Sequence, residues 1–362
     1  EEYRFSHKSF FEYLMAYRFF CYSWEIKSLQ GMDFAVQIFN ELAAAWQQDK
    51  EGFAIAGQRF SEAHVAASLH QMGCYLQDLN NFKETEKDYK AALEIRRRLS
   101  ATDPATHEPK LAMTLNNLGN IHSNMNDYAQ AAKEFDEALE IYRKLADTDP
   151  AAYEPYVAGT LNNLGALHYD MNDYPQAAKE YAEALEIRRR LSATAPAYEP
   201  DLAMTLNNLG NLHSVMNNYP QAAEELAEAL EIYKRLADAD PAAYEPDVAM
   251  TLNNLGALHY DMNDYAQAAE EYAEALEIRR KLAAANPAAY EPYVAGTLCN
   301  LAQMLAVQGN YSEAERSAVE GRDIFARFAK ECPGAFDGHM QAAEKLLSAI
   351  RTLKGNAEGG SR

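Results

Sequence analysis

The apolar residues of this chain recur at steps of three and four, and the whole pattern returns at a longer fixed interval. The string LNNLG occurs four times, beginning at Leu115, Leu161, Leu206 and Leu252, and two degraded copies begin at Leu69 and Leu298. Successive copies are 46, 46, 45, 46 and 46 residues apart. A constant period of this size is typical of stacked helical repeats, in which neighbouring units bury one continuous core. The sequence therefore predicts six repeats.

Each repeat is predicted to contain two helices, A and B. In the second repeat, helix A is expected from about 112 to 125, because Leu115, Leu118, His122 and Met125 share one face. Helix B follows Asp127, which can accept the N–H bonds that a first turn leaves unpaired. The equivalent N-cap positions hold Asn81, Asp173, Asn218, Asp264 and Asn310.

Six positions of this repeat resemble the signature of the tetratricopeptide repeat. We number the positions of a repeat as offsets, with Ala112 as offset 1 of the second repeat. At offsets 4, 7, 8, 20, 24 and 27 this repeat has Leu115, Leu118, Gly119, Ala131, Phe135 and Ala138. The resemblance covers about 65–330 and implies an all-α fold, a right-handed superhelix (α-solenoid) of about six helix-turn-helix repeats.

Two features depart from that signature. His122, His168, His213 and His259 stand where an aromatic residue is usual. The period is 46, whereas about 34 is usual, and long repeats of this kind resemble those of kinesin light chains. We expect the additional residues to lengthen helix B and to form a loop around Pro150 and Pro155.

A second period is superimposed on the first. Residues 112–157 match 203–248 at 35 of 46 positions, and residues 158–191 match 249–282 at 30 of 34. The array has therefore grown by duplication of a block of two repeats. Either the alternation presents the same groups at regular steps, or it is only the trace of a recent duplication.

The N-terminal segment differs from the repeats. Residues 5–16, FSHKSFFEYLMA, resemble the F-x-H-x-S-F-x-E-Y-x-x-A segment that closes the NACHT-type module of STAND ATPases. The matching residues are Phe5, His7, Ser9, Phe10, Glu12, Tyr13 and Ala16. The resemblance implies a parent protein with an ATP-driven oligomerisation switch. The alternative is an ordinary amphipathic helix.

Five segments follow from these patterns. We expect 1–30 to be the C-terminal end of a NACHT/STAND-type helical module, 31–64 a helical connector or degenerate hairpin, and 65–330 the repeat array. A capping helix should occupy 331–354, and 355–362 should be a disordered tail. The chain lacks an initiating Met and a phosphate-binding G-x-x-x-x-G-K-[ST] loop, so we expect it to be part of a longer protein whose ATPase activity lies elsewhere.

Charge and cysteine content narrow the class of partner. With 33 Lys and Arg against 54 Asp and Glu, the net charge is -21. This disfavours nucleic acid and anionic lipid and favours a neutral or basic protein partner, although the charge can also serve only solubility. The four cysteines show no metal-ligand spacing, and neither a membrane span nor a signal peptide is visible. We therefore expect a cytoplasmic protein.

No arrangement of residues indicates catalysis, a metal or a cofactor. The four repeated histidines would lie about 8–10 Å or more apart, too far for shared coordination when Zn–N bonds are about 2 Å long. We therefore assign them a packing role. No Ser-His-Asp or Cys-His arrangement and no phosphate loop is present, so an enzyme is the least favoured class.

The family resemblance implies that helix A lines the concave side of the superhelix. The residues that we expect to contact a partner there are Asn116, Asn120, Asn162, Tyr169, Asp170, Asn207, Asn211, Asn253, Tyr260 and Asp261. A row of Asn can donate to and accept from a peptide backbone, and Tyr is common at binding hot spots. The alternative concerns the two consecutive Asn of each LNNLG string, at offsets 5 and 6. One Asn of each pair, above all the one at offset 6, would then hydrogen-bond only to the backbone or to a neighbouring helix.

The leading hypothesis is a sensor array of a STAND-type ATPase that binds a polypeptide in signalling or defence, with oligomerisation through the missing N-terminal module. The second is a free-standing scaffold or cargo adaptor of the kinesin-light-chain type.

Overall fold

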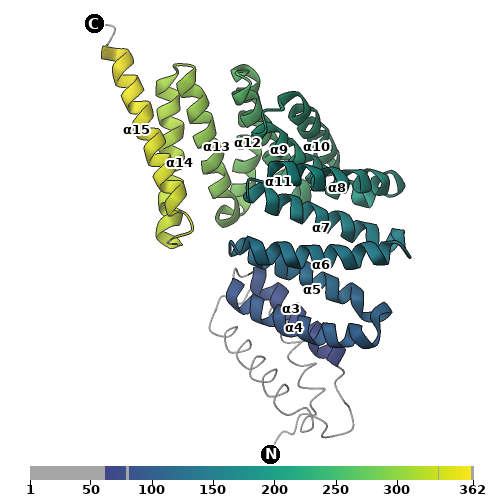
Figure 1. Cartoon of the computed structure of the whole chain (residues 1–362). Helices are drawn as coiled ribbons and strands as arrows, with labels where there is room; N and C mark the ends of the chain where they lie inside the picture. The colour runs from purple at the N-terminus through teal and green to yellow at the C-terminus, as the bar shows by residue number, and fades with distance from the viewer. Residues whose placement is uncertain (1–61, 79–80, 333, 360–362) are drawn as a thin grey trace, which may run out of the picture. The chain divides into compact units, whose positions relative to one another are not determined.

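The structure is a computed structural model that describes residues 62–78, 81–332 and 334–359 (Figure 1). These residues form α-helices and one short 3-10 helix, with no strand among them. The bounds are α3 Glu62–Asp78, α4 Phe82–Thr102, α5 Pro104–Asn124, α6 Tyr128–Ala146, α7 Pro150–Asp170, α8 Tyr174–Thr194, η2 Pro196–Tyr198, α9 Glu199–Val215, α10 Tyr219–Ala239, α11 Pro241–Asp261, α12 Tyr265–Ala285, α13 Pro287–Val307, α14 Tyr311–Glu331 and α15 Asp337–Gly359. The predictions for 1–30 and for 31–64 lie outside the described residues, except that 62–64 belong to α3.

The helices pack in chain order as antiparallel hairpins. In the part from Tyr142 onward, α7 pairs with α8, α9 with α10, α11 with α12 and α13 with α14. The second helix of each hairpin also packs against the first helix of the next hairpin (Figure 1). The part up to Ile141 repeats the arrangement with α3, α4 and α5. This confirms the predicted all-helical array of two-helix repeats.

The first helix of each repeat is longer than the sequence suggested. The segment expected to be a loop around Pro150 and Pro155 forms the first turns of α7, and only 147–149 separate α6 from α7. Pro150 occupies the first helical turn, where a missing N–H does no harm. The Asp149 carboxylate caps that turn by accepting from the N–H of Ala152 at 3.2 Å. The loop prediction is therefore wrong, and the added residues extend both helices.

The predicted caps of helix B are confirmed in position and differ in chemistry. The carboxylates of Asp127, Asp173 and Asp264 each accept from the backbone N–H three residues later, at 3.2–3.3 Å. Asn218 and Asn310 occupy the same position without a side-chain cap bond. The charged residue is the stronger acceptor and also interacts favourably with the helix dipole.

The turn between the two helices of a repeat depends on one residue in the left-handed region. Asn126, Asn172, Asn217 and Asn263 have φ of 60–62°, and Gly309 takes the same place with φ 78°. In each Asn turn the side-chain carbonyl also accepts from the hydroxyl of the Tyr two residues later, at 2.7–2.9 Å. Asn is among the few residues with a side chain that tolerate this conformation.

Replacing Asn172 therefore separates conformation from hydrogen bonding. Asn172→Ala should lower the free energy of unfolding by about 1 kcal/mol, because alanine is strained at this φ. Asn172→Gly should change it by less, since glycine adopts this φ freely and loses only the bond from Tyr174. Equilibrium urea unfolding followed by circular dichroism measures both variants. Equal losses for the two would show that the hydrogen bond matters and the left-handed conformation does not.

The last helix closes the described array. Ala343, Leu347 and Ile350 of α15 are buried against α13 and α14. The helix continues to Gly359, so residues 355–359 do not form the disordered tail that we expected. Residues 360–362 lie outside the described part.

Candidate protein-binding groove

The paired asparagines of helix A join one repeat to the next. The side-chain Nδ2 of Asn208 donates to Oδ1 of Asn162 at 3.2 Å, and that of Asn254 donates to Oδ1 of Asn207 at 3.1 Å. Asn253 accepts in the same way from Asn300 at 3.2 Å. Each bond crosses from one helix A to the neighbouring helix A. The asparagines therefore form a hydrogen-bonded ladder along the array.

This ladder changes the predicted roles of the two Asn positions. Asn162 and Asn207 are buried, and their carbonyl oxygens are engaged by the next repeat, so we remove both from the predicted binding residues. Asn253 also accepts from Arg279 and Thr297 at 3.3 Å. The sequence favoured offset 5 for ligand contact and left ligand contact and internal bonding equally open at offset 6. The structure instead buries Asn162 and Asn207 at offset 5, whereas Asn116 and Asn253 at the same offset are half-buried.

A groove of 510 Å³ opens along α7, α9 and α11. Four predicted residues line it together: Tyr169, Asp170, Asn211 and Asp261. Seven others complete the lining: Ala166, Tyr181, Asn208, Ser214, Val215, Asn254 and Ala257. The groove thus brings together aromatic, amide and carboxylate groups from three successive repeats. Asn208 and Asn254 belong both to the ladder and to this lining.

The remaining predicted residues lie elsewhere. The Tyr260 hydroxyl accepts from Nε2 of Gln303 at 3.2 Å, and its ring packs against Tyr265. Asn116 and Asn120 belong to the part of the chain before Tyr142 and are half-buried. For these three residues, contact with a partner stays a prediction.

The electrostatics of the groove favour cations. Partial burial raises the pKa of the Asp170 and Asp261 carboxyls. None of the lining residues is Lys or Arg, so neither carboxylate has a cationic neighbour within the groove. A basic side chain from a partner would therefore offset the cost of burying these charges.

The repeated histidines have a specific polar role that sequence reasoning missed. Nδ1 of His122 lies 2.6 Å from Oε2 of Glu134, and this carboxylate raises the pKa of His122. The other three pairs, each at 2.7 Å, are His168 with Glu180, His213 with Glu225 and His259 with Glu271. The spacing of twelve residues between His and Glu was visible in the sequence. Each pair fixes helix A against helix B, which refines the packing role that we expected, and no group suited to a metal ion occurs among the described residues.

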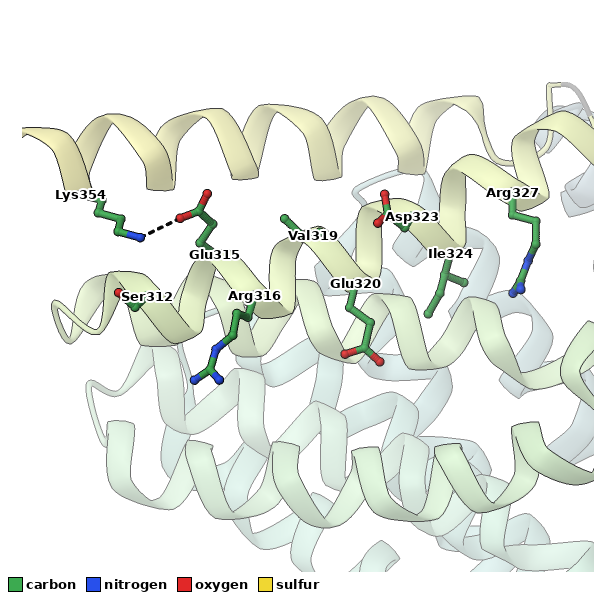
Figure 2. Close-up of a pocket in the computed structure, with 9 residues that line it drawn as sticks. All are labelled: Ser312, Glu315, Arg316, Val319, Glu320, Asp323, Ile324, Arg327 and Lys354. Atoms are coloured by element: carbon green, nitrogen blue, oxygen red, sulfur yellow. Dashed lines mark hydrogen bonds and ion pairs between the residues drawn. The ribbon is translucent and has the colours of Figure 1, made fainter.

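A second groove, of 680 Å³, lies over α14 and is shown in Figure 2. Its charged side chains are already paired. Lys354 contacts Glu315 at 3.0 Å, and Glu320 contacts Arg280 of α12 at 2.7 Å. Arg316 and Arg327 contact carboxylates on α14 and α13 respectively. These contacts belong to the ion pairs of the outer helix surface, so this groove has less charge to offer a ligand than the first.

Comparison with known proteins agrees with this architecture. A sequence profile described as tetratricopeptide repeat matches residues 64–144, 110–190, 156–235 and 201–281, and a second profile of that description matches 294–324. The chain belongs to the tetratricopeptide repeat family. No curated protein sequence matches it.

Three solved structures of tetratricopeptide-like fold are similar. BtubC (BKLC) from P. vanneervenii has a TM-score of 0.55 and 24% identity, over 68% of this chain and 92% of that one. The apo form of RapI has a TM-score of 0.53 and 16% identity, over 81% of this chain and 99% of that one. The third is PH0952 from Pyrococcus horikoshii, a signal transduction ATPase with numerous domains (STAND) that has a tetratricopeptide repeat sensor. Its TM-score is 0.58 and its identity 16%, over 95% of this chain and 47% of that one. The chain thus spans about half of that last protein, and at these identities the similarity shows the fold alone.

Repeats of the matched family are suited to binding other proteins. Among the described helices, none is both long and apolar enough to span a bilayer.

Proposed function

We propose that this tetratricopeptide array recognises a polar or basic segment of another protein in the groove formed by α7, α9 and α11. The observation that carries the proposal is the joint lining of one groove by Tyr169, Asp170 and Asp261, with no basic residue among its neighbours. Tyr supplies contact area with a polar tip, and the two carboxylates select for positive charge. The net charge of -21 favours the approach of such a partner.

We further propose that the array is the sensor part of a STAND-type ATPase in signalling or defence. Two observations support this: the NACHT-like segment at residues 5–16 and the similar fold of a STAND protein that carries a tetratricopeptide repeat sensor. A free-standing scaffold of the kinesin-light-chain type is the second candidate, supported by the long repeat. Sequencing the gene upstream of Glu1 distinguishes them, since the first requires a phosphate-binding loop within several hundred residues.

The groove can be tested without knowing the natural partner. Random peptides of roughly twelve residues, displayed on phage, are selected on the chain, and the enriched peptides are synthesised. We expect them to be rich in Lys and Arg. Asp170→Asn combined with Asp261→Asn should raise their Kd at least about tenfold, since both charge contacts are lost. Because both pKa values are raised, binding should also weaken with falling pH earlier than ordinary aspartates would predict.

The matched control removes the same charge outside the groove. Asp238 and Asp323 are exposed residues of α10 and α14, and Asp238→Asn with Asp323→Asn should leave the Kd within about twofold. If both double variants weaken binding equally, the effect is one of net charge and the groove is not the site.

A further inference from the structure

A row of exposed methionines occurs at one position of successive repeats. Met171, Met216 and Met262 are 44%, 42% and 42% exposed, and Met125 at the same position in the second repeat is 36% exposed. Methionine is usually among the most buried residues. A regular row of large apolar side chains in solvent is the kind of surface that proteins use for binding.

The row runs beside the groove described above. Asp170 immediately precedes Met171, and Asp261 immediately precedes Met262. Val215, itself 44% exposed and part of the groove lining, immediately precedes Met216. We call Met171, Val215, Met216 and Met262 the methionine rim. The groove therefore has acidic and amide groups inside and an apolar border along the C-terminal ends of α7, α9 and α11.

The fold does not require methionine at these positions. The backbone N–H of each of the three methionines donates to the carbonyl four residues before it, at 3.0 Å, and this bond involves no side chain. In the last repeat Gln308 takes the same position, and its N–H donates to Met304 at 3.2 Å. A polar residue thus makes the same turn. The cap bond therefore does not depend on a methionine side chain.

We propose that the methionine rim binds the apolar face of an amphipathic, basic helix of a partner protein, whose cationic face reaches Asp170 and Asp261. This rests on the proposed function and specifies the partner class. Methionine side chains are unbranched and polarisable, so they adapt to apolar surfaces of varied shape. A helix in a groove presents apolar and charged residues on separate faces, and the rim and the two carboxylates are arranged in the same separated way.

The burial of Asn162 and Asn207 removes two of the side chains that we expected to hold an extended chain, and this favours a helix. An extended peptide needs free amides along the groove to pair with its backbone, and the carbonyls of Asn162 and Asn207 are bonded within the array. A helix satisfies its own backbone and needs only side-chain contacts.

Two peptides of identical composition test this proposal. Both contain Leu and Lys and are about 18 residues long; one places Leu at i, i+3, i+4 and i+7, and the other is scrambled so that no apolar face forms. We expect the wild-type chain to bind the patterned peptide at least about tenfold more tightly than the scrambled one. The Kd of each is measured by fluorescence anisotropy.

Replacing the three methionines with Gln, the residue at 308, should abolish that preference and leave the circular dichroism spectrum unchanged. Leu353→Gln removes an exposed apolar side chain of α15 away from the rim and should retain the preference. Asp170→Asn with Asp261→Asn should weaken both peptides alike.

The outcomes separate this inference from the function on which it rests. Equal wild-type Kd values for the two peptides, or a preference that survives the triple Gln change, would overturn the rim proposal while the aspartate variants still report on the groove. If neither peptide binds, both proposals fail. Binding of the chain to phosphatidylcholine–phosphatidylserine vesicles that the triple Gln change abolishes would assign the rim to a membrane surface and also overturn it.

Discussion

Gly165→Ala should lower the free energy of unfolding by about 2 kcal/mol, because the added methyl group has no space. A Cβ at this position would lie 2.7 Å from Cδ1 and Cε1 of the Tyr181 ring. The ring is buried between the two helices of its repeat, so it cannot move aside without disturbing their packing. Equilibrium urea unfolding followed by circular dichroism measures the loss.

The same helix contains a matched control. Gly159 also lies within α7, but a Cβ there would meet nothing within 4 Å. Gly159→Ala should therefore raise the free energy of unfolding by about 0.5–1 kcal/mol through helix propensity alone. If both alanine variants stabilise the protein, the contact with Tyr181 does not limit the size of residue 165.

In the last repeat, a small residue replaces the aromatic ring at this contact. Ala302 stands where the other repeats have Gly, and Ala318 stands where Tyr181 and Tyr272 lie. Both alanines are fully buried. In a double-mutant cycle, Gly165→Ala should consequently be less harmful in the Tyr181→Ala background than in wild type, by about 1 kcal/mol or more.

Arg188→Ala should cost about 3 kcal/mol of folding free energy. Arg188 is 4% exposed and joins α8 to the next repeat. Its Nη1 donates to the carbonyl of Asp201 at 2.6 Å and to Oγ1 of Thr205. The Thr205 hydroxyl in turn donates to Asn162 at 3.2 Å. Truncation leaves the buried Thr205 hydroxyl oxygen without this donor and creates a cavity between two repeats, and each of these is destabilising.

The adjacent residue provides the control for Arg188. Arg189 is half exposed and pairs with Glu228 of α10 at 2.6 Å, so Arg189→Ala should change stability by no more than about 1 kcal/mol. Urea unfolding of both variants tests the difference. Similar small losses for the two would mean that the buried guanidinium contributes no more than a surface ion pair.

The position of Arg188 also gives the two-repeat period a structural meaning. The corresponding position in successive repeats is occupied by Arg96, Tyr142, Arg188, Tyr233, Arg279 and Phe325. Arg279, like Arg188, donates to the carbonyl and the threonine hydroxyl of the next helix A. Beside Tyr233 the corresponding hydroxyl, Oγ1 of Thr251, has no hydrogen-bond partner. Buried arginine and aromatic contacts therefore alternate between repeats.

The sequence by itself determined the repeat unit and its two helices. Periodicity alone located the hairpins and the N-cap positions, because buried helix faces require apolar residues at steps of three and four. The same reasoning failed at Pro150 and Pro155, which are turn residues in most contexts and lie within the first turns of α7 here.

Only the tertiary structure decided which polar residues face inward. Asn162 and Asn163 are neighbours on one helix, and a small rotation of that helix against the next repeat decides which one is buried. Tyr181 and Ala177 of helix B pack in one buried cluster with Leu209 and Leu212 of the next helix A, and no local pattern encodes that contact between repeats. It is also through packing that Tyr169, Asp170, Asn211 and Asp261, from three repeats, come to line one groove beside the methionine rim.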